Sequence, residues 1–248
     1  MPANTLFLRL EAPLQSWGER SRWSIRDTAP VPTKSGIIGL IACALGYRDD
    51  DEIRSLSQKT RLGIRVDNPG IQIVDYHTIG GGYDHPTLLT AQGKPKKSSG
   101  APHTEISERA YLCDASFLAA LQLRDNTDAP LITQMAEALQ NPVWPIFLGR
   151  KACTPSRPVF AGTGEFVNLQ EALKQHETFT HYRLSWQIKE PFALRLILEH
   201  DQPTGHRHRD NIHSRQYRVY HPRYTTETAV TATIKKEEND HVSLQIAA

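Results

Sequence analysis

The sequence predicts an α+β fold in which a domain of alternating strands and helices is followed by a β-rich segment. Apolar stretches of strand length and of helix length alternate through residues 1–160, whereas short strand-like stretches dominate residues 161–248. Apolar residues make up 39% of the 248, and the 16 prolines and 15 glycines are spread along the chain. This distribution excludes a collagen-like or low-complexity protein and indicates a globular one with many loops.

The first part of the chain is expected to hold one strand and two helices. Thr5–Glu11 is largely apolar, apart from Arg9, and is typical of a strand. A loop containing several prolines continues to residue 33. Residues 35–46 predict an apolar helix with Ser35 as its N-cap. Residues 50–58 predict a second helix, whose acidic first turn suits the helix dipole.

The middle of the chain predicts strands around a long insertion. Residues 61–67 and 71–78 are strand-like on either side of Asn68-Pro-Gly70, which predicts two strands joined by a turn. Residues 79–107 form a polar insertion, and an insertion of that length in a compact domain is usually functional or disordered. Residues 108–123 fit a helix or a strand by periodicity. Their place between the insertion and a helix at 130–140, capped by Asp128, favours one long strand.

This order of elements is typical of a ferredoxin-like, RRM-type domain. We therefore expect such a domain at residues 1–160, with its insertion at 79–107. Residues 161–248 are expected to pack on it as a smaller β-rich extension. That extension is predicted to contain a helix at 168–175 and strands at 183–189, 192–199 and 228–234.

Composition narrows the chemistry and the environment. The net charge of +2 is lower than a free-standing nucleic-acid-binding domain usually carries, so only local charge clusters are informative. The three cysteines are far apart, which favours reduced thiols, and the histidines of residues 200–221 lack the spacing of a metal site. No signal peptide or apolar stretch of about 20 residues is present. We expect a soluble cytoplasmic protein without a metal or cofactor.

The sharpest local feature is Pro32-Thr-Lys-Ser-Gly36, at the start of the apolar helix. Lys34, Ser35 and the free N–H groups of a helix N-terminus suit an anion, although the glycine spacing of a P-loop is missing. An ordinary capped helix is the alternative. Aromatic and basic side chains interleave just upstream, at Trp17, Arg20, Arg22, Trp23 and Arg26. That pattern favours contacts with phosphates and bases.

A second basic feature is Phe147-Leu-Gly-Arg-Lys151. Gly149 allows the backbone to turn or to approach another segment closely. Arg150 and Lys151 are natural phosphate ligands. A solvated surface turn is the alternative interpretation.

Six segments of the chain together resemble a known family. They are residues 8–10 (LRL), 14–18 (LQSWG), 32–40 (PTKSGIIGL), 75–78 (DYHT), 109–117 (RAYLCDASF) and 147–151 (FLGRK). In this order and spacing they resemble the CasD family, which is the fifth family of CRISPR-associated proteins in its type I-E form and part of the RAMP superfamily. The resemblance runs from residue 5 to about residue 160. Residues 214–219 look like the family's C-terminal strand.

The resemblance implies a non-catalytic subunit of Cascade, a CRISPR surveillance complex used in antiviral defence. Such a subunit holds the 5′ handle of the CRISPR RNA (crRNA), and contacts the repeated backbone subunit and the large subunit. Target DNA would be met only through the complex. The insertion at 79–107 would be the family's thumb, which reaches over the RNA toward a neighbouring subunit.

The motif positions also imply candidate RNA-binding residues. Lys34, Arg109, Arg150 and Lys151 fall on them and suit phosphate. For Trp17, His77 and Tyr111, a base contact and a core role are both open.

An enzymatic function is the main alternative. In a sister subtype the corresponding subunit cuts precursor crRNA without metal, using a tyrosine after the first helix and an adjacent Lys-His pair. Tyr47 corresponds to that tyrosine, but the chain contains no Lys-His dipeptide, so the partners for acid–base chemistry are missing. Lys97 and His103 have the wrong spacing to replace them. A generic protein-interaction module would leave the arginine-aromatic segments unexplained.

Overall fold

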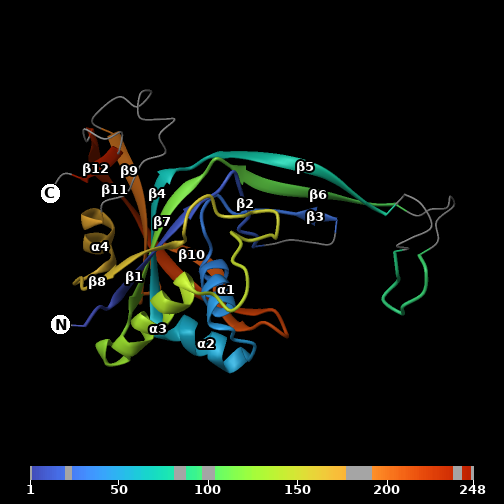
Figure 1. Ribbon diagram of the computed structural model, residues 1–248, viewed down its shortest axis with the longest axis horizontal. Coiled ribbons are helices and arrows are strands. Elements are labelled where there is room, and N and C mark those ends of the chain that lie inside the picture. The colour runs from blue at the N-terminus through green and yellow to red at the C-terminus, as the bar shows by residue number, and fades with distance from the viewer. Residues whose placement is uncertain are drawn as a thin grey trace.

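The fold, taken from a computed structural model, is a large antiparallel sheet with helices on both faces and a long two-stranded ribbon extending from it (Figure 1). The structure describes residues 2–19, 24–80, 88–96, 104–176, 192–236 and 242–246. The larger sheet contains β1 (Thr5–Glu11), β4 (Thr60–Asn68), β7 (Ser116–Leu123), β8 (Phe160–Gly164), β9 (Phe192–His200), β10 (His206–Ser214), β11 (Val219–Lys236) and β12 (Val242–Ile246). Its order is β10-β11-β9-β4-β7-β1-β8, and β12 pairs with β11.

Two hydrophobic cores lie on the two faces of this sheet, because side chains alternate along a strand. Leu6, Leu8 and Leu10 of β1 pack with the helices α1 (Lys34–Leu45), α2 (Asp50–Lys59) and α3 (Ala129–Gln140). Phe7 points to the other face and packs in the core under α4 (Leu169–Gln175). The predicted first strand and the four predicted helices are therefore present, and each of their boundaries lies within one residue of its predicted position.

Helix α1 begins one residue before the predicted start. Thr33, rather than Ser35, is its N-cap, and the Thr33 side chain accepts a hydrogen bond from the Gly36 N–H. Gly46 ends the helix with φ +78°, in the left-handed region that glycine adopts most easily. The Asp128 position before α3 is also an N-cap, but its side chain makes no capping bond; a short 3-10 turn, η1 (Asn126–Asp128), precedes it.

The prediction of one long strand at 108–123 is wrong. Two strands, β6 (Thr104–Cys113) and β7, occupy this segment, and Asp114 between them has φ +56°. The break sends β6 into a smaller sheet with β2 (Leu14–Gln15), β3 (Ile25–Arg26) and β5 (Ile71–Gly80). Both short strands, β2 and β3, lie in the segment that was predicted to be a loop.

Strands β5 and β6 form the antiparallel ribbon that leaves the body of the molecule. Their register runs from Ile71 opposite Cys113 to Gly80 opposite Thr104. The strands expected at 61–67 and 71–78 exist as β4 and β5, but they lie in different sheets and do not form a hairpin. The extended arm therefore starts near residue 71, earlier than the insertion predicted at 79–107.

Residues from the C-terminal part of the chain continue the larger sheet, since β9 pairs with both β4 and β11. The strand expected at 228–234 lies within the longer β11, and the strand expected at 183–189 lies outside the described residues. Residues 214–219 do not form one strand, which corrects that expectation: residues 215–218 are the turn between the end of β10 at Ser214 and the start of β11 at Val219. Among the described helices, none is long and apolar enough to cross a membrane.

Candidate nucleic-acid interface

Four arginine side chains converge on one groove of about 790 Å³. Arg26 comes from β3, Arg150 from the loop after α3, and Arg215 and Arg218 from the turn between β10 and β11. The described residues that line the groove include no aspartate or glutamate. Three segments far apart in the sequence thus build a concave surface with a positive charge, which is the kind of surface that attracts a phosphate chain.

The floor of the groove includes two glycines of α1, Gly36 and Gly39. A Cβ atom at Gly36 would lie 2.8 Å from Cε3 of Trp17, so this glycine lets the indole ring pack against the helix. A Cβ atom at Gly39 would meet no other atom within 4 Å. The helix therefore presents bare backbone to the groove at residue 39, and a ligand can approach it closely.

Arg150 is held in place by the protein before any ligand binds. Its Nη1 donates to the carbonyl oxygen of Ala110 (2.9 Å), its Nη2 donates to that of Arg26 (3.0 Å), and the guanidinium lies 4.6 Å from the ring centroid of Tyr111. A Cβ atom at Gly149 would overlap the carbonyl oxygen of Ser16, which confirms the predicted close backbone approach. These contacts position the basic loop at the edge of the groove.

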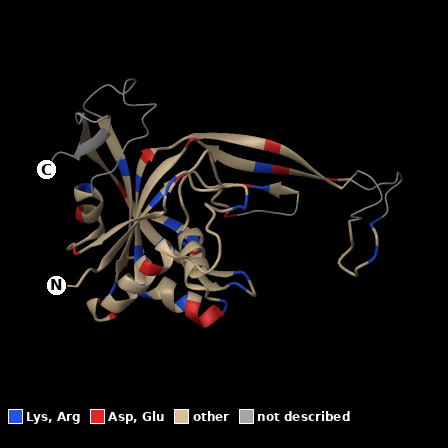
Figure 2. Cartoon of the chain, in the orientation of Figure 1, with Lys and Arg blue, Asp and Glu red and all other residues tan. Residues whose placement is uncertain are grey.

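The turn that carries Arg215 and Arg218 is fastened to the start of α2. The Ser214 hydroxyl donates to Oδ2 of Asp50 (2.7 Å), and Nη2 of Arg215 donates to the carbonyl oxygen of Arg48 (2.6 Å). The hydrogen bond from Ser214 lowers the pKa of Asp50. Figure 2 shows basic residues of the chain close to the acidic first turn of α2, in agreement with the ion pair between Arg215 and Asp50. Neither arginine was predicted as a site residue, although two arginines and a tyrosine within four residues were a signal.

Lys34 does not contact the groove, and its predicted role as a phosphate ligand is wrong. Its side chain is fully buried, and Nζ donates to Oε1 of Glu199 (2.8 Å) and to the carbonyl oxygen of Thr60 (2.9 Å). Burial lowers the pKa of Lys34, and the charge of Glu199 opposes that change. A lysine after an N-cap is ambiguous in sequence, because the acid that pairs with it lies 165 residues away.

The N-terminus of α1 already has an anion, and it comes from the protein itself. The Lys34 N–H donates to Oδ2 of Asp210 (2.7 Å), and Arg223 donates to both oxygens of the same carboxylate. Burial alone would raise the pKa of Asp210, but the hydrogen bonds and charge of Arg223 hold it below its usual value. The anion site predicted at 32–36 is thus filled by a carboxylate of β10.

Two aromatic residues of the predicted set have core positions. Trp17 is 2% exposed and its Nε1 donates to Oε1 of Gln15 (3.1 Å), while Tyr111 is 6% exposed beneath Arg150. For these two residues the structure favours the core role over the base contact. Trp17 nevertheless lines the groove, and its ring lies against Gly36.

The remaining predicted residues are accessible but dispersed. Ser35 and Arg26 line the groove. Lys151 is exposed and directly follows the groove residue Arg150 in the sequence. His77 and Arg109 lie on the ribbon. Nδ1 of His77 is 3.3 Å from Oδ2 of Asp75, and Nε of Arg109 donates to the Ser107 hydroxyl (3.1 Å). Arg20, Arg22 and Trp23 lie outside the described residues.

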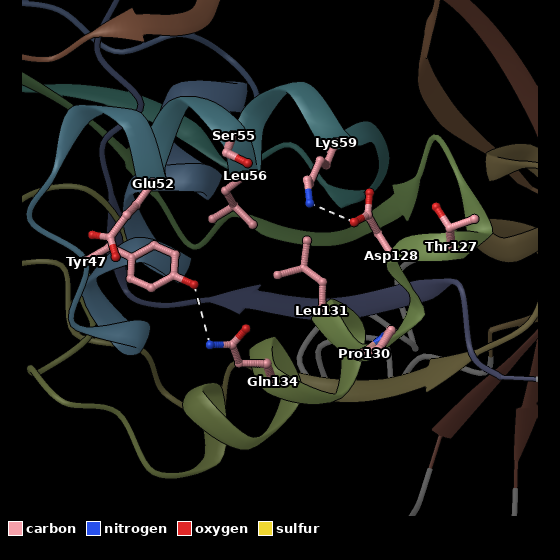
Figure 3. Close-up of a pocket in the computed structure, with 10 residues that line it drawn as sticks. All are labelled: Tyr47, Glu52, Ser55, Leu56, Lys59, Thr127, Asp128, Pro130, Leu131 and Gln134. Atoms are coloured by element: carbon pink, nitrogen blue, oxygen red, sulfur yellow. Dashed lines mark hydrogen bonds and ion pairs between the residues drawn. The ribbon is translucent and has the colours of Figure 1, made fainter.

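Tyr47 lies in a separate pocket of about 410 Å³ between α2 and α3 (Figure 3). Its hydroxyl accepts a long hydrogen bond from Nε2 of Gln134 (3.5 Å), and Lys59 in the same pocket is paired with Asp128 (2.7 Å). The described residues lining this pocket include no histidine. Lys97 and His103 lie outside the described part of the chain. Among the residues that can be described, no group of three or more His, Cys, Asp or Glu could hold a metal ion.

Comparison with known proteins gives consistent results. The sequence model of a family described as CRISPR-associated protein (Cas_Cas5) matches residues 5–241. The Escherichia coli (strain K12) protein named CRISPR system Cascade subunit CasD is 33% identical over 176 residues, which cover 69% of this chain and 76% of that protein.

Two solved structures agree with this family. A chain of a CRISPR RNA-guided surveillance complex is 31% identical with a TM-score of 0.74, over 96% of this chain and 95% of that one. A structure titled Crystal structure of Cas protein is 32% identical with a TM-score of 0.62, over 91% of this chain and 94% of the other.

Proposed function

Because the chain belongs to the Cas5 family of CRISPR-associated proteins, as its sequence motifs indicated, we propose that it is a subunit of a CRISPR surveillance complex of the Cascade type. In that complex it binds the 5′ handle of the crRNA and carries out no cleavage. The observation that carries this proposal is the groove lined by Arg26, Arg150, Arg215 and Arg218 without an acidic side chain among its described residues.

The groove fits single-stranded RNA better than a small anion. Its arginines come from three segments, so their charges are spread along a surface instead of being focused on one point. Proteins that bind single strands combine a positive groove, which follows the backbone, with accessible aromatic side chains. Arg26, Arg215, Arg218 and the exposed Lys151 bind phosphates, while Arg150 uses two of its donors on the protein and contributes charge.

The central strands support a ferredoxin-like arrangement of the RAMP type. In sequence the elements are β1, α1, β4, β7, α3 and β8, and in the sheet the four strands lie in the order β8-β1-β7-β4 with antiparallel neighbours. This places the first and third strands at the centre, as in the fold that the sequence predicted. Residues 161–248 add β9 to β12 at the β4 edge and supply the arginine-bearing turn.

The ribbon is the thumb, through which the subunit contacts the repeated backbone subunit and the RNA. It carries apolar side chains that are unusually exposed for a soluble surface: Val74 is 61%, Tyr76 64% and Ile106 48% exposed. His77 and Arg109 lie on the same ribbon and contact the RNA there. The large subunit binds the body, and target DNA is met only through the assembled complex.

Absence of cleavage is proposed because the described residues around Tyr47 supply no histidine and no unpaired lysine. A tyrosine that starts RNA cleavage needs a base and a group that stabilises developing charge. In the described pocket the Tyr47 hydroxyl has Gln134 as its hydrogen-bond partner, and the nearby Lys59 is neutralised by Asp128. The pocket of Tyr47 and the arginine groove share no described lining residue, so the groove would hold RNA at a different site from this tyrosine.

The test is binding of a labelled handle RNA to the purified chain over a range of salt concentrations. The double variant Arg215→Ala/Arg218→Ala should bind more weakly. Its slope of log affinity against log salt should be shallower by about 1.4, because each phosphate contributes about 0.7 for a single strand. Arg195→Ala removes an arginine that is 46% exposed on β9 and does not line the groove, and it should leave the slope unchanged.

A second variant tests the position of the RNA without changing charge. Gly39→Leu places a good helix former where space is open, so folding should be preserved while the floor of the groove is filled and RNA affinity falls. Unchanged binding in both groove variants would place the RNA elsewhere. A discrete cut of repeat-containing RNA without metal, lost in Tyr47→Phe, would contradict the non-catalytic role.

A further inference from the structure

One aromatic side chain of the groove has no explained role in the RNA contact. Tyr220 lines the groove on β11, where it lies opposite Ile212 of β10, and it is 39% exposed. The rest of the groove lining includes four arginines and the two glycines of α1. A tyrosine at the start of a strand is usually half-buried against neighbours, and this one also lines the groove.

The groove that Tyr220 lines has room for a flat ligand. Gly39 leaves open space above α1, and the lining residues other than the arginines, Trp17, Ile212 and Tyr220 are small. The turn that precedes Tyr220 is braced, because the Tyr217 N–H donates to the Ser214 hydroxyl, which is itself bound to Asp50. A ring on a braced hairpin loses little conformational freedom when a flat ligand stacks on it.

We propose that Tyr220 is a stacking platform for an unpaired nucleobase of the RNA in the groove, so that the site takes single-stranded RNA with at least one base turned toward the protein. This inference rests on the proposed function and deepens it, since it assigns the recognition of bases to a residue separate from the arginines. The arginines bind phosphates, which every nucleotide has, whereas the ring contacts a base.

A nucleobase is favoured over a protein partner at this position. Arg215 and Arg218 line the groove with Tyr220, and the described lining contains no acid, so the surroundings suit a polyanion. Aromatic rings beside arginines are the usual combination in sites for single-stranded nucleic acid. Tyr217, on the same turn, is 74% exposed but does not line the groove, so it provides a matched comparison.

The experiment uses the full chain and two labelled probes, a single-stranded handle RNA and an abasic oligomer of the same length with the same ribose-phosphate backbone. Tyr220→Ala should raise the Kd for the RNA about 5- to 150-fold, the range found when stacking aromatics are truncated, and leave the Kd for the abasic probe unchanged. Tyr220→Phe should bind both probes like the wild type, because it keeps the ring. Tyr217→Ala should also bind both normally.

The outcomes separate this inference from the proposed function. If Arg215→Ala/Arg218→Ala weakens both probes but Tyr220→Ala weakens neither, or weakens both equally, the groove binds RNA and Tyr220 is no stacking platform. A larger loss for Tyr217→Ala than for Tyr220→Ala also overturns the assignment. Normal RNA binding by Tyr220→Ala together with failure to co-purify with other subunits would make Tyr220 a protein contact. Absence of RNA binding by the wild type would overturn both proposals.

Discussion

At the scale of single residues, two glycines three positions apart on α1 have opposite structural roles. A methyl group at Gly36 would lie 2.8 Å from the Trp17 ring, whereas one at Gly39 would meet nothing within 4 Å. Glycine inside a helix costs about 0.5–1 kcal/mol relative to alanine. The helix keeps both, Gly36 for packing and Gly39 for the open floor of the groove.

This contrast predicts stability changes of opposite sign. Gly39→Ala should raise the free energy of unfolding by about 0.5–1 kcal/mol, because it gains helix propensity without a clash. Gly36→Ala should lower it by about 1–3 kcal/mol, since the added methyl group forces Trp17 to move. Urea unfolding of both variants beside the wild type measures this. Equal effects of the two substitutions would contradict the packing of Trp17 on Gly36.

Lys34 and Lys151 were both predicted to bind phosphate, but substitutions of the two should have different effects on stability. Lys34→Met should lower the free energy of unfolding by about 3 kcal/mol, because it breaks the buried ion pair with Glu199. This value is at the lower end of the range for such pairs, since Glu199 still has Arg124 as a partner. Lys151 is exposed, so Lys151→Ala should change stability by less than about 0.5 kcal/mol.

Lys34 and Lys151 should also differ in their effect on the salt dependence of RNA binding. The slope of log affinity against log salt should fall by about 0.7 in Lys151→Ala and stay unchanged in Lys34→Met. Lys34→Met should first be checked by circular dichroism for native folding at the assay temperature. A reduced slope in a folded Lys34→Met protein would show that this ammonium reaches the RNA.

At the scale of elements, Asp210 joins the β10–β11 hairpin to the N-terminus of α1. Its carboxylate accepts from the Lys34 N–H and from Arg223, and both side chains of the ion pair are buried. The hairpin carries two of the four groove arginines, and α1 carries the glycine floor. One buried carboxylate therefore ties the arginine-bearing hairpin to the helix that forms the floor of the groove.

The lowered pKa of Asp210 predicts how its contribution depends on pH. A carboxyl group with a lower pKa in the folded state contributes stability that is fully present above its unfolded pKa of about 3.9 and is lost as the pH falls through the folded value. Asp210→Asn should therefore be less stable than the wild type by about 3–5 kcal/mol near pH 7. Urea unfolding should show this gap shrinking below about pH 4. A gap that stays constant down to pH 2 would exclude the charge of Asp210 as its cause.

Local signals were sufficient for elements whose boundaries are set nearby. The strand Thr5–Glu11 was predicted with its observed bounds, and α2 follows its acidic first turn. The segment 108–123 was not resolved into two strands, because both halves are strand-like and the break is a single left-handed residue, Asp114. Which strand pairs with which depends on distant segments, so the separation of β4 from β5 could not be predicted.

The same limit applies to the site. Arg26, Ser35 and Arg150 were predicted from local motifs and do line the groove. Lys34 looked equivalent to them, and only the fold brings Glu199 beside it. Arg215 and Arg218 were passed over because residues 214–219 were interpreted as a strand. A predicted turn would have suggested that the two arginine side chains lie on the same exposed segment, as they do in the structure.

At the scale of the whole molecule, the groove and the ribbon are distinct parts with distinct expected roles. The groove needs both halves of the chain, since Arg26 and Arg150 come from residues before 160 and Arg215 and Arg218 from residues after it. Strand β9 pairs with β4 within the same sheet, so the C-terminal part is needed for the fold as well as for the site. The ribbon, by contrast, extends away from both cores (Figure 1).

This separation predicts that the ribbon can be shortened without loss of the body. Gly80 and Thr104 are register partners, so residues 81–103 can be replaced by Asn-Gly, which favours the two-residue turn of a hairpin. The shortened chain should unfold at the temperature of the wild type and bind handle RNA within a few-fold of it, because the groove is intact. It should fail to co-purify with the repeated backbone subunit.

The Arg215→Ala/Arg218→Ala variant is the matched control, since it keeps the ribbon and alters only the groove. It should lose affinity for RNA while the exposed Val74 and Tyr76 remain available to a neighbouring subunit. If the shortened chain does not fold, residues 81–103 contribute to the core of the body. If it assembles normally with the backbone subunit, the partner surface lies on the body and the ribbon is a passive extension.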